Sequence, residues 1–403
     1  MVRGVLQTDT TPTPPSERIR SLDALRGFAL LGILLVNVRA FSMPEAVLLN
    51  PTAYGEFTGW NYRVWFLGHV FARSKFITVF AALFGAGTSL FLRSKDRSDQ
   101  PAVRLYLRRT AVLVVIGLLH AYLLWYGDVL VAYGVVGLLL LTVRDLSPGK
   151  LAALGVLLLS VRSLTELSVG VAVGGEAVAS QWAPAEATLR REVATYRDGW
   201  LGQMSHRVGS SFRRQTTGFA ASTFWRVGGT MLLGTALYRW GVLTGERSAR
   251  LHRRLVVAGV ARVAVVVAGV AYIEANDWSA DAALFWRQFN YWGSLLVAGG
   301  YVGGITLYAR RRPEGAVTRG LAAVGRMALT NYLLQTVVAT TVFYGHGLGL
   351  FGSVSRVWGL GFVVAVWVVQ VALSVCWLRA FEFGPAEWLW RWATYGSRPP
   401  LRS

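Results

Sequence analysis

The segment GLLHAYLLWYGDVLVAYG (residues 117–134) places two ionisable residues, His120 and Asp128, in otherwise apolar sequence. Burial in apolar surroundings favours neutral imidazole, so His120 could take a proton from a hydroxyl or amine, or accept an acyl group. Asp128 could orient this imidazole or simply cap the next helix, and Tyr122 and Tyr126 could relay a proton instead. Because ionisable groups are costly in hydrocarbon, we treat His120 as the first catalytic candidate.

A second histidine, His69, lies in FLGHVFARS beside Arg73 and Lys75. The plainer interpretation is an interfacial histidine on an amphipathic helix. The alternative is a catalytic residue, and we keep His69 as the second choice.

Asp23, Arg26 and Asn37 occur within SLDALRGFALLGILLVN (residues 21–37). Asp23 and Arg26 are three residues apart, so they share a helix face and can form a pair. In the functional interpretation, Arg26 binds a phosphate or carboxylate at the inner mouth of a span. In the structural one, Arg26 reaches the lipid headgroups and Asn37 bonds a neighbouring helix.

A third polar group follows in GRMALTNYLLQT (residues 325–336). The helical spacing predicts one polar stripe on one span, directed toward the bundle interior because lipid would not tolerate it. We expect this stripe to line a polar cavity, although packing between helices could also account for it. The residues concerned are Arg326, Thr330, Asn331 and Gln335.

The elements that must position these residues are membrane-spanning helices. Hydrophobic residues make up 54% of the 403, and apolar runs long enough to cross a bilayer recur along the chain. We predict an all-α polytopic membrane protein with about ten spans. They cover residues 22–40, 76–92, 110–126, 129–143, 151–171, 219–237, 255–273, 289–309, 327–344 and 357–378.

The remaining segments complete the domain organisation. Residues 1–17 are predicted to form a disordered cytoplasmic tail, and residues 18–396 a single transmembrane domain. Within that domain, five spans (18–171) and five spans with a tail motif (219–396) flank a large extracytoplasmic loop, 172–218. In this loop, Leu189, Val193, Tyr196 and Trp200 recur at helical spacing and predict one amphipathic interfacial helix.

The net charge of +20 follows this topology. Most excess Lys and Arg fall in the segments predicted to lie inside, which places both termini in the cytoplasm of a bacterial inner membrane. The basicity is thus explained by topology and anionic lipid, and nucleic acid is not an expected partner. The single cysteine, Cys376, excludes an internal disulfide or a cysteine-based metal site, and we expect no metal.

Four motifs together resemble a known family. SLDALRGFALLGILLVN, RRTAVLVVIGLLHAYLLWYGDVLVAYGVVGL, GRMALTNYLLQT and FEFGPAEWLWRWATYG look like those of the YeiB-like membrane proteins, which carry domain of unknown function 418. The match runs from about residue 18 to 396. Its motif positions here are Asp23, Arg26, Gly27, Asn37, His120, Gly127, Asp128, Gly325, Arg326, Thr330, Asn331, Tyr332, Gly384, Pro385, Glu387 and Arg391.

The resemblance carries a functional expectation. The family is usually placed beside heparan-glucosaminide acetyltransferases and other transmembrane acyltransferases, which implies transfer from acyl-CoA to an acceptor at or across the membrane. In those relatives the acyl-accepting histidine follows the first span in an outer segment, where only His69 sits comparably here, in sequence that does not match. We therefore keep His120 ahead of His69.

The expected activity is an acyl-CoA-dependent O- or N-acyltransferase acting on a sugar, lipid or secondary metabolite. Asp23, Arg26 and Arg326 would hold the donor. The acceptor side would use Asn37, Tyr122, Tyr126, Thr330, Asn331 and Gln335. The alternative is a proton-coupled transporter or exporter. Membrane lipids and a small-molecule acceptor are the expected partners, and a homodimer is one oligomeric state left open.

Overall fold

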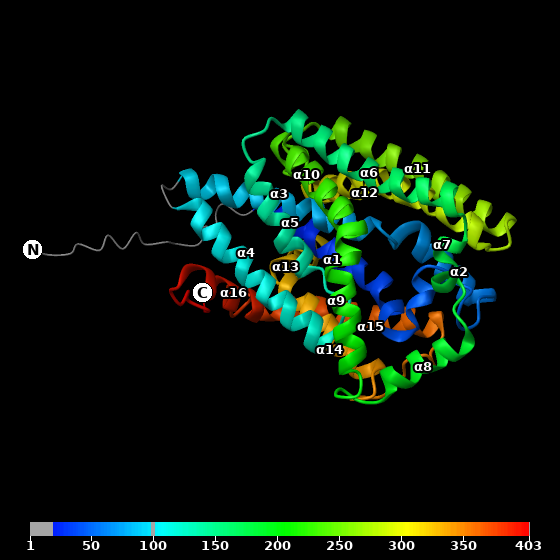
Figure 1. The fold of residues 1–403 in the computed structure, drawn as a ribbon. Coiled ribbons are helices and arrows are strands. Elements are labelled where there is room, and N and C mark those ends of the chain that lie inside the picture. The colour runs from blue at the N-terminus through cyan, green and yellow to red at the C-terminus, as the bar shows by residue number, and fades with distance from the viewer. Residues whose placement is uncertain (1–18, 98–100, 403) are drawn as a thin grey trace, which may run out of the picture.

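The computed structural model describes residues 19–97 and 101–402, and within these residues the chain is organised almost entirely as helices (Figure 1). The predicted N-terminal tail lies outside the described residues. In chain order, the helices of the first half are α1 (Arg20–Ser42), η2 (Glu45–Leu48), α2 (Gly59–Leu67), η3 (Gly68–Ala72), α3 (Lys75–Arg97), α4 (Ala102–Leu119), η4 (His120–Leu124), α5 (Leu130–Thr142), α6 (Pro148–Val173), α7 (Glu176–Trp182), α8 (Glu186–Arg197) and α9 (Met204–Gln215).

The second half contains the helices that complete the bundle. They are η5 (Phe219–Thr223), α10 (Phe224–Arg239), α11 (Ala249–Ala275), α12 (Ala280–Arg311), α13 (Ala316–Arg326), α14 (Ala328–Phe343), α15 (Arg356–Trp377) and α16 (Pro385–Tyr395). Figure 1 shows α6, α10, α11 and α12 along one side of the molecule and α4, α14 and α15 along the other, with α1 between them.

Six helical stretches of the described residues are long and apolar enough to cross a membrane. They are Arg20–Ser42, Gly59–Arg97, Ala102–Leu124, Pro148–Val173, Ala249–Ala275 and Arg356–Trp377. The all-α membrane architecture expected from the sequence is thereby supported. Each of the ten segments predicted as spans also overlaps a helix, and α5 and α14 are shorter apolar helices.

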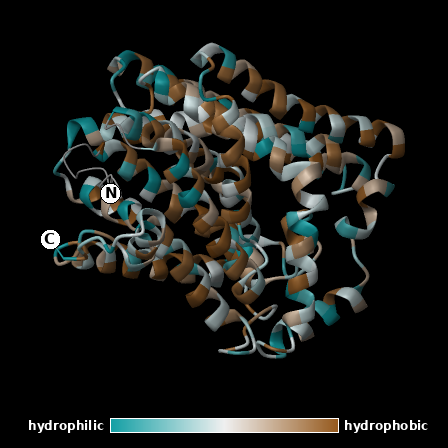
Figure 2. Cartoon of the chain, turned by 60° about the vertical axis from the view of Figure 1, so that its left-hand side comes forward, coloured by the Kyte–Doolittle hydropathy of each residue, from teal (hydrophilic) through white to brown (hydrophobic). Residues whose placement is uncertain are grey.

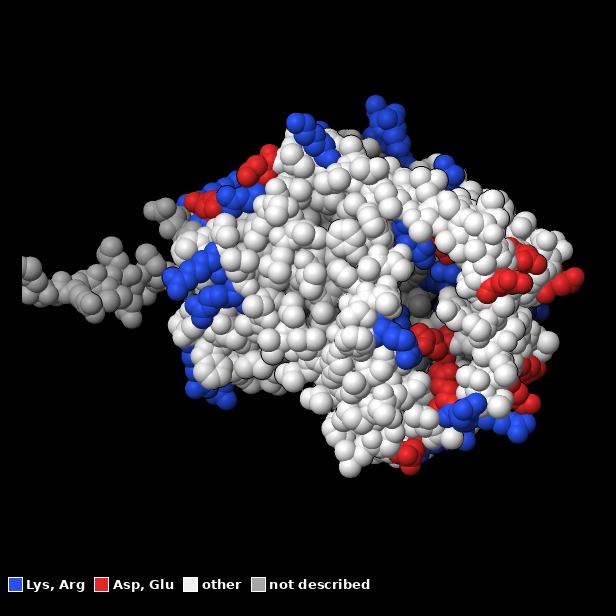
Figure 3. Space-filling model, viewed as in Figure 1, with Lys and Arg blue, Asp and Glu red and all other residues white. Residues whose placement is uncertain are grey.

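Charge and hydropathy divide the molecule into zones. In Figure 2 the middle of the long helices is largely hydrophobic, with hydrophilic residues gathered toward their ends. Figure 3 shows an uncharged band between a basic end and an end of mixed charge. We call the first, near α16 and the start of α4, the basic end. The second, near α2, α7 and α8, is called the loop end.

Two departures from the predicted elements concern the loop end and α14. The 172–218 region contains three helices, α7, α8 and α9, rather than one; α8 covers the predicted amphipathic segment and buries Leu189 and Tyr196. In addition, the helix predicted over GRMALTNYLLQT breaks at Met327. Arg326 is the last residue of α13, and Thr330 lies in the first turn of α14. These residues therefore do not form one continuous stripe.

Close packing of α1 against α13 fixes the centre of the bundle. A Cβ atom at Gly27 would lie 1.9 Å from the Leu321 carbonyl oxygen, and one at Gly325 would lie 1.9 Å from the Asp23 carbonyl oxygen. Only glycine permits backbones to approach this closely, as small residues commonly do between membrane helices. The contact holds Arg26 and Arg326, the neighbours of these glycines, at the same end of the bundle.

Candidate functional site

A cavity of about 500 Å³ lies within the bundle and is lined by residues of α1, α3, α4, α5, α13, α14 and α16, with single residues of η2, η3 and α9. On α1 it extends from Asp23 to Ala40, which at 1.5 Å per residue is about 25 Å. Such a volume is typical of small-molecule sites. The cavity is therefore elongated along α1.

The basic end of the cavity has a charged lining. Arg26 donates to the Asp23 carboxylate over 2.8 Å, and the Arg109 guanidinium lies 3.7 Å from the centre of the Trp390 ring. Four guanidinium groups and three carboxylates meet here, so the surface can bind anionic groups and also orient them. The residues are Asp23, Arg26, Arg109, Arg326, Glu382, Glu387 and Arg391.

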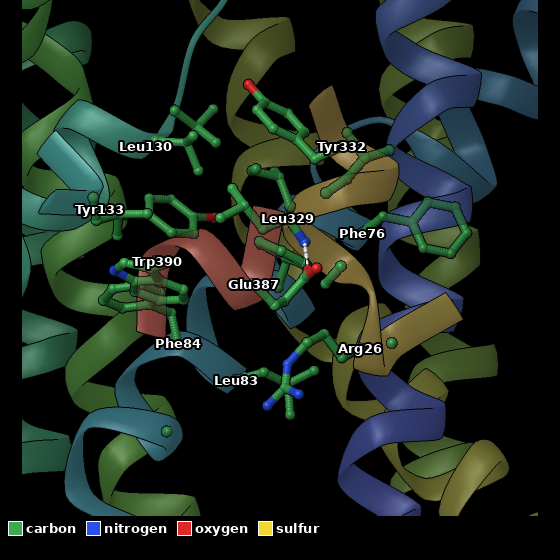
Figure 4. A pocket seen from close by; sticks show the side chains of 18 of the residues that line it. Arg26, Phe76, Leu83, Phe84, Leu130, Tyr133, Leu329, Tyr332, Glu387 and Trp390 are labelled. Atoms are coloured by element: carbon green, nitrogen blue, oxygen red, sulfur yellow. Dashed lines mark hydrogen bonds between the residues drawn. The ribbon is translucent and has the colours of Figure 1, made fainter. Parts of the chain in front are cut away.

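Glu387 joins the C-terminal tail to the start of α14. Its carboxylate accepts hydrogen bonds from the backbone N–H groups of Leu329 and Thr330, over 2.6 and 3.1 Å, and from the Thr330 hydroxyl (Figure 4). These N–H groups have no partner within their own helix, so Glu387 supplies an N-terminal cap from another helix. Burial raises the pKa of Glu387, and the hydrogen bonds from Thr330 offset part of this effect.

The middle of the cavity is apolar and aromatic. Phe76, Leu83, Phe84, Leu130 and Leu329 contribute hydrocarbon surface. Tyr133 extends from α5 toward Leu329 in Figure 4. The buried hydroxyls of Tyr133 and of Tyr332 make no hydrogen bond within the described protein. The zone therefore suits an extended apolar chain with one or two polar atoms.

The loop end of the cavity is lined by Asn37, Ala40, Leu48, Trp125, Tyr126 and Arg214. The Arg214 guanidinium lies 5.5 Å from the centre of the Tyr126 ring and 3.6 Å from the Glu45 carboxylate. The backbone N–H of Glu45 in turn donates to Glu192 over 2.9 Å. Two carboxylates thus stand beside this end of the cavity.

Glu192, on α8, has the titration expected of a proton acceptor near neutral pH. Burial raises its pKa to about 7, and the neighbouring Glu45 charge acts in the same direction. A carboxylate with such a pKa is suited to general acid–base chemistry at physiological pH. It does not line the cavity itself, but it interacts electrostatically with Tyr126, which does.

His120 forms a hydrogen-bonded chain with Asp128 and Thr336. Its Nδ1 lies 2.9 Å from the Asp128 carboxylate and its Nε2 lies 2.9 Å from the Thr336 hydroxyl. Asp128 also caps α5, because its second oxygen accepts from the Val131 N–H over 2.9 Å. The two predicted roles of Asp128 are therefore compatible.

The acid–imidazole–hydroxyl order of this chain is that of hydrolytic triads. However, His120, Asp128 and Thr336 are absent from the cavity lining. The His120 ring packs instead behind Tyr332, with ring centres 5.0 Å apart. His120 is thus positioned to hold the cavity wall rather than to touch a ligand within it.

His69 is also separated from the cavity. It lies in η3 between the rings of Trp65 and Trp286, at 5.1 and 5.3 Å, and is buried. Neither ring nitrogen has a hydrogen-bond partner within the described protein. The histidine expected on an amphipathic helix is thus enclosed by aromatic rings and does not line the cavity.

Most of the predicted polar stripe connects helices instead of lining the cavity. The Asn331 amide donates to Ser374 over 2.9 Å, and the Gln335 amide donates to Gln370 over 3.0 Å. Thr330 is used by Glu387, as described above. The expectation that these three residues face a polar cavity is corrected. Asn331 and Gln335 form hydrogen bonds from α14 to α15, and Thr330 forms one to α16.

The cavity therefore brings together only part of the predicted set. Asp23, Arg26, Arg326, Asn37 and Tyr126 line it. The residues that do not are His120, Asp128, His69, Tyr122, Thr330, Asn331 and Gln335. Their chemical roles were inferred from residue type and spacing, which do not show whether a side chain meets a cavity or a neighbouring helix.

Several lining residues were not singled out in the sequence. Arg109 and Arg214 were counted only as part of basic segments, and Tyr133 was not distinguished from other aromatic residues. Helical spacing on α4 could have indicated Arg109, because Tyr106, Arg109, Thr110 and Leu113 recur at steps of three and four and all line the cavity. Nothing comparable in the sequence distinguishes Arg214.

Comparison with known proteins gives consistent matches. Residues 237–397 match the family model described as "Protein of unknown function (DUF418)". The chain is 37% identical over 397 residues to "Uncharacterized protein YeiB" of Escherichia coli strain K12, covering 96% of this chain and 99% of that protein.

Two Bacillus proteins are also similar over nearly the full length. The chain is 32% identical to "Uncharacterized protein YxaH" of Bacillus subtilis strain 168, covering 97% of each. It is 26% identical to "Uncharacterized 39.9 kDa protein in amylase 3'region" of Bacillus acidopullulyticus, again over 97% of each.

Proposed function

This chain belongs to the YeiB-like DUF418 family of membrane proteins. We propose that it is an acyltransferase and that the cavity is its active site. The donor is an acyl-CoA, and the acceptor is a hydroxyl or amine of a small molecule or lipid. The observation that carries the proposal is the shape and lining of the cavity: elongated, charged at one end and apolar in the middle.

The donor fits this lining in one direction. Its phosphates would bind at the basic end, where Arg26, Arg109 and Arg326 converge, since guanidinium groups pair well with phosphate. The ring systems of Trp390 and Tyr395 offer a surface for a base to stack on. The thin pantetheine arm and the acyl chain would then follow the apolar middle toward the loop end.

Transfer itself would take place near the loop end. The acceptor oxygen or nitrogen forms a bond to the acyl carbon, the thioester C–S bond breaks, and the acceptor's proton is finally carried by the departing thiol. Asn37 and Tyr126 are placed to bind the acceptor or the acyl carbonyl. Glu192 is one candidate base. His120, the candidate from the sequence, is the alternative and would act through Tyr332, which lines the cavity.

The membrane arrangement follows from the same division of charge. We propose ten spans, with the basic end and both termini in the cytoplasm of a bacterial inner membrane, as the positive-inside rule favours. The donor then enters from the cytoplasm, and the acceptor meets it from the other side. The surrounding partners are membrane lipids.

Substitution of Arg26 tests the donor site. Arg26→Ala should raise KM for acyl-CoA at least about tenfold, because a charge-assisted hydrogen bond contributes roughly 1.5–3 kcal/mol, and should lower kcat less. The measurement is thiol release by purified protein in detergent with acyl-CoA of varied length and candidate acceptors. Arg20→Ala is the matched control, since Arg20 lies at the same end, exposed and paired with Glu314. A fall in kcat with KM unchanged would remove Arg26 from the donor site.

One observation favours a second function. The cavity has a charged residue at each end, Arg26 at the basic end and Arg214 at the loop end, as a path for a polar substrate across the membrane would have. A transporter would move a substrate between sealed compartments and release no thiol from acyl-CoA. Uptake into proteoliposomes without thiol release would therefore favour proton-coupled transport over acyl transfer.

A further inference from the structure

A group of buried cations lies at the loop end, outside the cavity lining. Arg39 lies in the last turn of α1 and is 7% exposed. Arg73 directly follows η3, and Lys75 is the first residue of α3 and is fully buried. Arg73 interacts electrostatically with Arg39, and His69 interacts with all three. The group therefore occupies one locality, which we call the cation cluster: Arg39, Arg73 and Lys75.

No carboxylate forms an ion pair with the cation cluster within the described residues. Lys75 donates to two neutral acceptors, the His69 carbonyl at 2.8 Å and the Asn290 side chain. The nearby carboxylate of Glu166 is already shared by Arg162, at 2.6 Å, and Arg287, at 2.9 Å. Glu166 interacts electrostatically with Arg73 but forms no ion pair with it, so positive charge is concentrated here with little internal compensation, which is energetically costly.

The same locality contains unused hydrogen-bond donors. One guanidinium nitrogen of Arg39, one of Arg73, and the indole nitrogens of Trp65 and Trp286 make no hydrogen bond within the described protein. Trp65 and Trp286 flank His69, whose ring nitrogens are also without partners, and Arg73 lies 6.0 Å from the Trp286 ring. A set of donors with several positive charges is the complement of an anion.

From this arrangement we propose that the cation cluster binds a phosphate group of a ligand. The guanidinium groups of Arg39 and Arg73, each with an unused donor, match more than one negative charge, so a single carboxylate is not a sufficient partner. A phosphomonoester or pyrophosphate supplies about two charges and several acceptor oxygens, and arginine binds these oxygens in pairs. The ligand is either a phosphorylated lipid headgroup or a soluble phosphate compound.

The cluster lies next to the cavity, and Arg73 is its partly exposed member, whereas Arg39 and Lys75 are buried. Arg287 remains 26% exposed on its side chain, and Figure 3 shows a hollow toward the loop end with basic side chains recessed in it. Ala40, Ala72 and Ser74, the chain neighbours of Arg39 and Arg73, line the cavity. A phosphate held by the cluster therefore places the rest of its molecule beside the loop end of the cavity. The binding site stands independently of the proposed acyl transfer.

The first experiment measures binding of pyrophosphate to the full chain in uncharged detergent by calorimetry. Arg39→Gln and Arg73→Gln should each weaken binding at least about tenfold. Arg63→Gln is the matched control, because Arg63 is exposed at the same end and packs on Trp60, and it should bind as the unchanged protein does. Equal weakening in all three variants, or in none, overturns the site.

A second measurement separates a binding role from a structural one. Without ligand, Arg39→Gln should melt no lower than the unchanged protein, because it removes an uncompensated buried charge. The difference in melting temperature on adding pyrophosphate should shrink in the variant. A large loss of stability in the absence of any phosphate compound would show that Arg39 serves the fold instead, and would overturn the proposal.

A lipid arm identifies the source of the phosphate. The protein is placed in phosphatidylcholine nanodiscs with and without phosphatidic acid, and retained lipid is measured by native mass spectrometry. Retention of phosphatidic acid that is lost in Arg39→Gln but kept in Arg63→Gln indicates a lipid headgroup. Pyrophosphate binding without such retention indicates a soluble ligand. Failure of both arms rejects the site, whatever thiol-release assays show.

Discussion

Glu192 and His120 are the two side chains that could receive the acceptor's proton, and they differ in what surrounds them. Both ring nitrogens of His120 are engaged, by Asp128 and Thr336, and Tyr332 stands between the ring and the cavity. Glu192 accepts one backbone hydrogen bond and titrates near pH 7. Neither side chain lines the cavity, so His120, with both nitrogens bonded, is assigned a positioning role, and Glu192, with a pKa of about 7, is proposed as the base.

The two variants should accordingly differ in pH dependence. A base must be deprotonated to act, so acyl transfer should increase as pH rises through about 7 in the unchanged protein. Glu192→Gln should lose this rise and at least about a hundredfold of rate above pH 7. His120→Gln should keep the rise while lowering stability by about 1–3 kcal/mol, since its hydrogen bonds are disrupted. A pH–rate profile that stays intact in Glu192→Gln would exclude Glu192 as the base.

How far the site could be predicted depended on residue type. Charged residues near the ends of spans were predicted to bind ligand, and Asp23, Arg26 and Arg326 do line the cavity. Asn331 and Gln335 donate across to Ser374 and Gln370 of α15, and a single sequence does not show whether such an amide faces a partner helix or a hollow.

At the scale of elements, α1 organises the site because it contributes to the cavity along nearly its whole length. Apolar runs predicted the position of α1 and of the other long helices well, since their length and composition are strong signals. The break at Met327 was missed. Its cap, Glu387, comes from 57 or 58 residues further along the chain, and only the tertiary fold shows that it reaches Leu329 and Thr330.

The α1–α13 contact makes a separate prediction about elements. Gly27→Ala should destabilise the protein by about 1–3 kcal/mol or more, because the added Cβ would press on the Leu321 carbonyl and force the helices apart. Gly361→Ala on α15 is the matched control, since nothing lies within 4 Å of a Cβ there. Melting temperatures in one detergent compare them. Equal melting of the two variants would contradict the close approach of α1 and α13.

At the scale of the whole molecule, the proposed orientation in the membrane predicts which end of the protein can be labelled from outside the cell. In a Cys376→Ala background, Ser353→Cys at the loop end should react with an impermeant maleimide added to intact cells. Asp145→Cys, at a side chain 91% exposed near the basic end, should react only after the membrane is opened. The reverse pattern would invert the proposed topology.

The length of the cavity bears on the order in which the donor and the acceptor bind. The cavity runs about 25 Å along α1 from the basic end to the loop end, so a donor and an acceptor that enter at opposite ends would meet inside it. The donor would enter at the basic end and the acceptor at the loop end, and their reacting groups would meet inside the cavity. Neither would then need to leave before the other came in, and the spent carrier could withdraw on the side from which it entered.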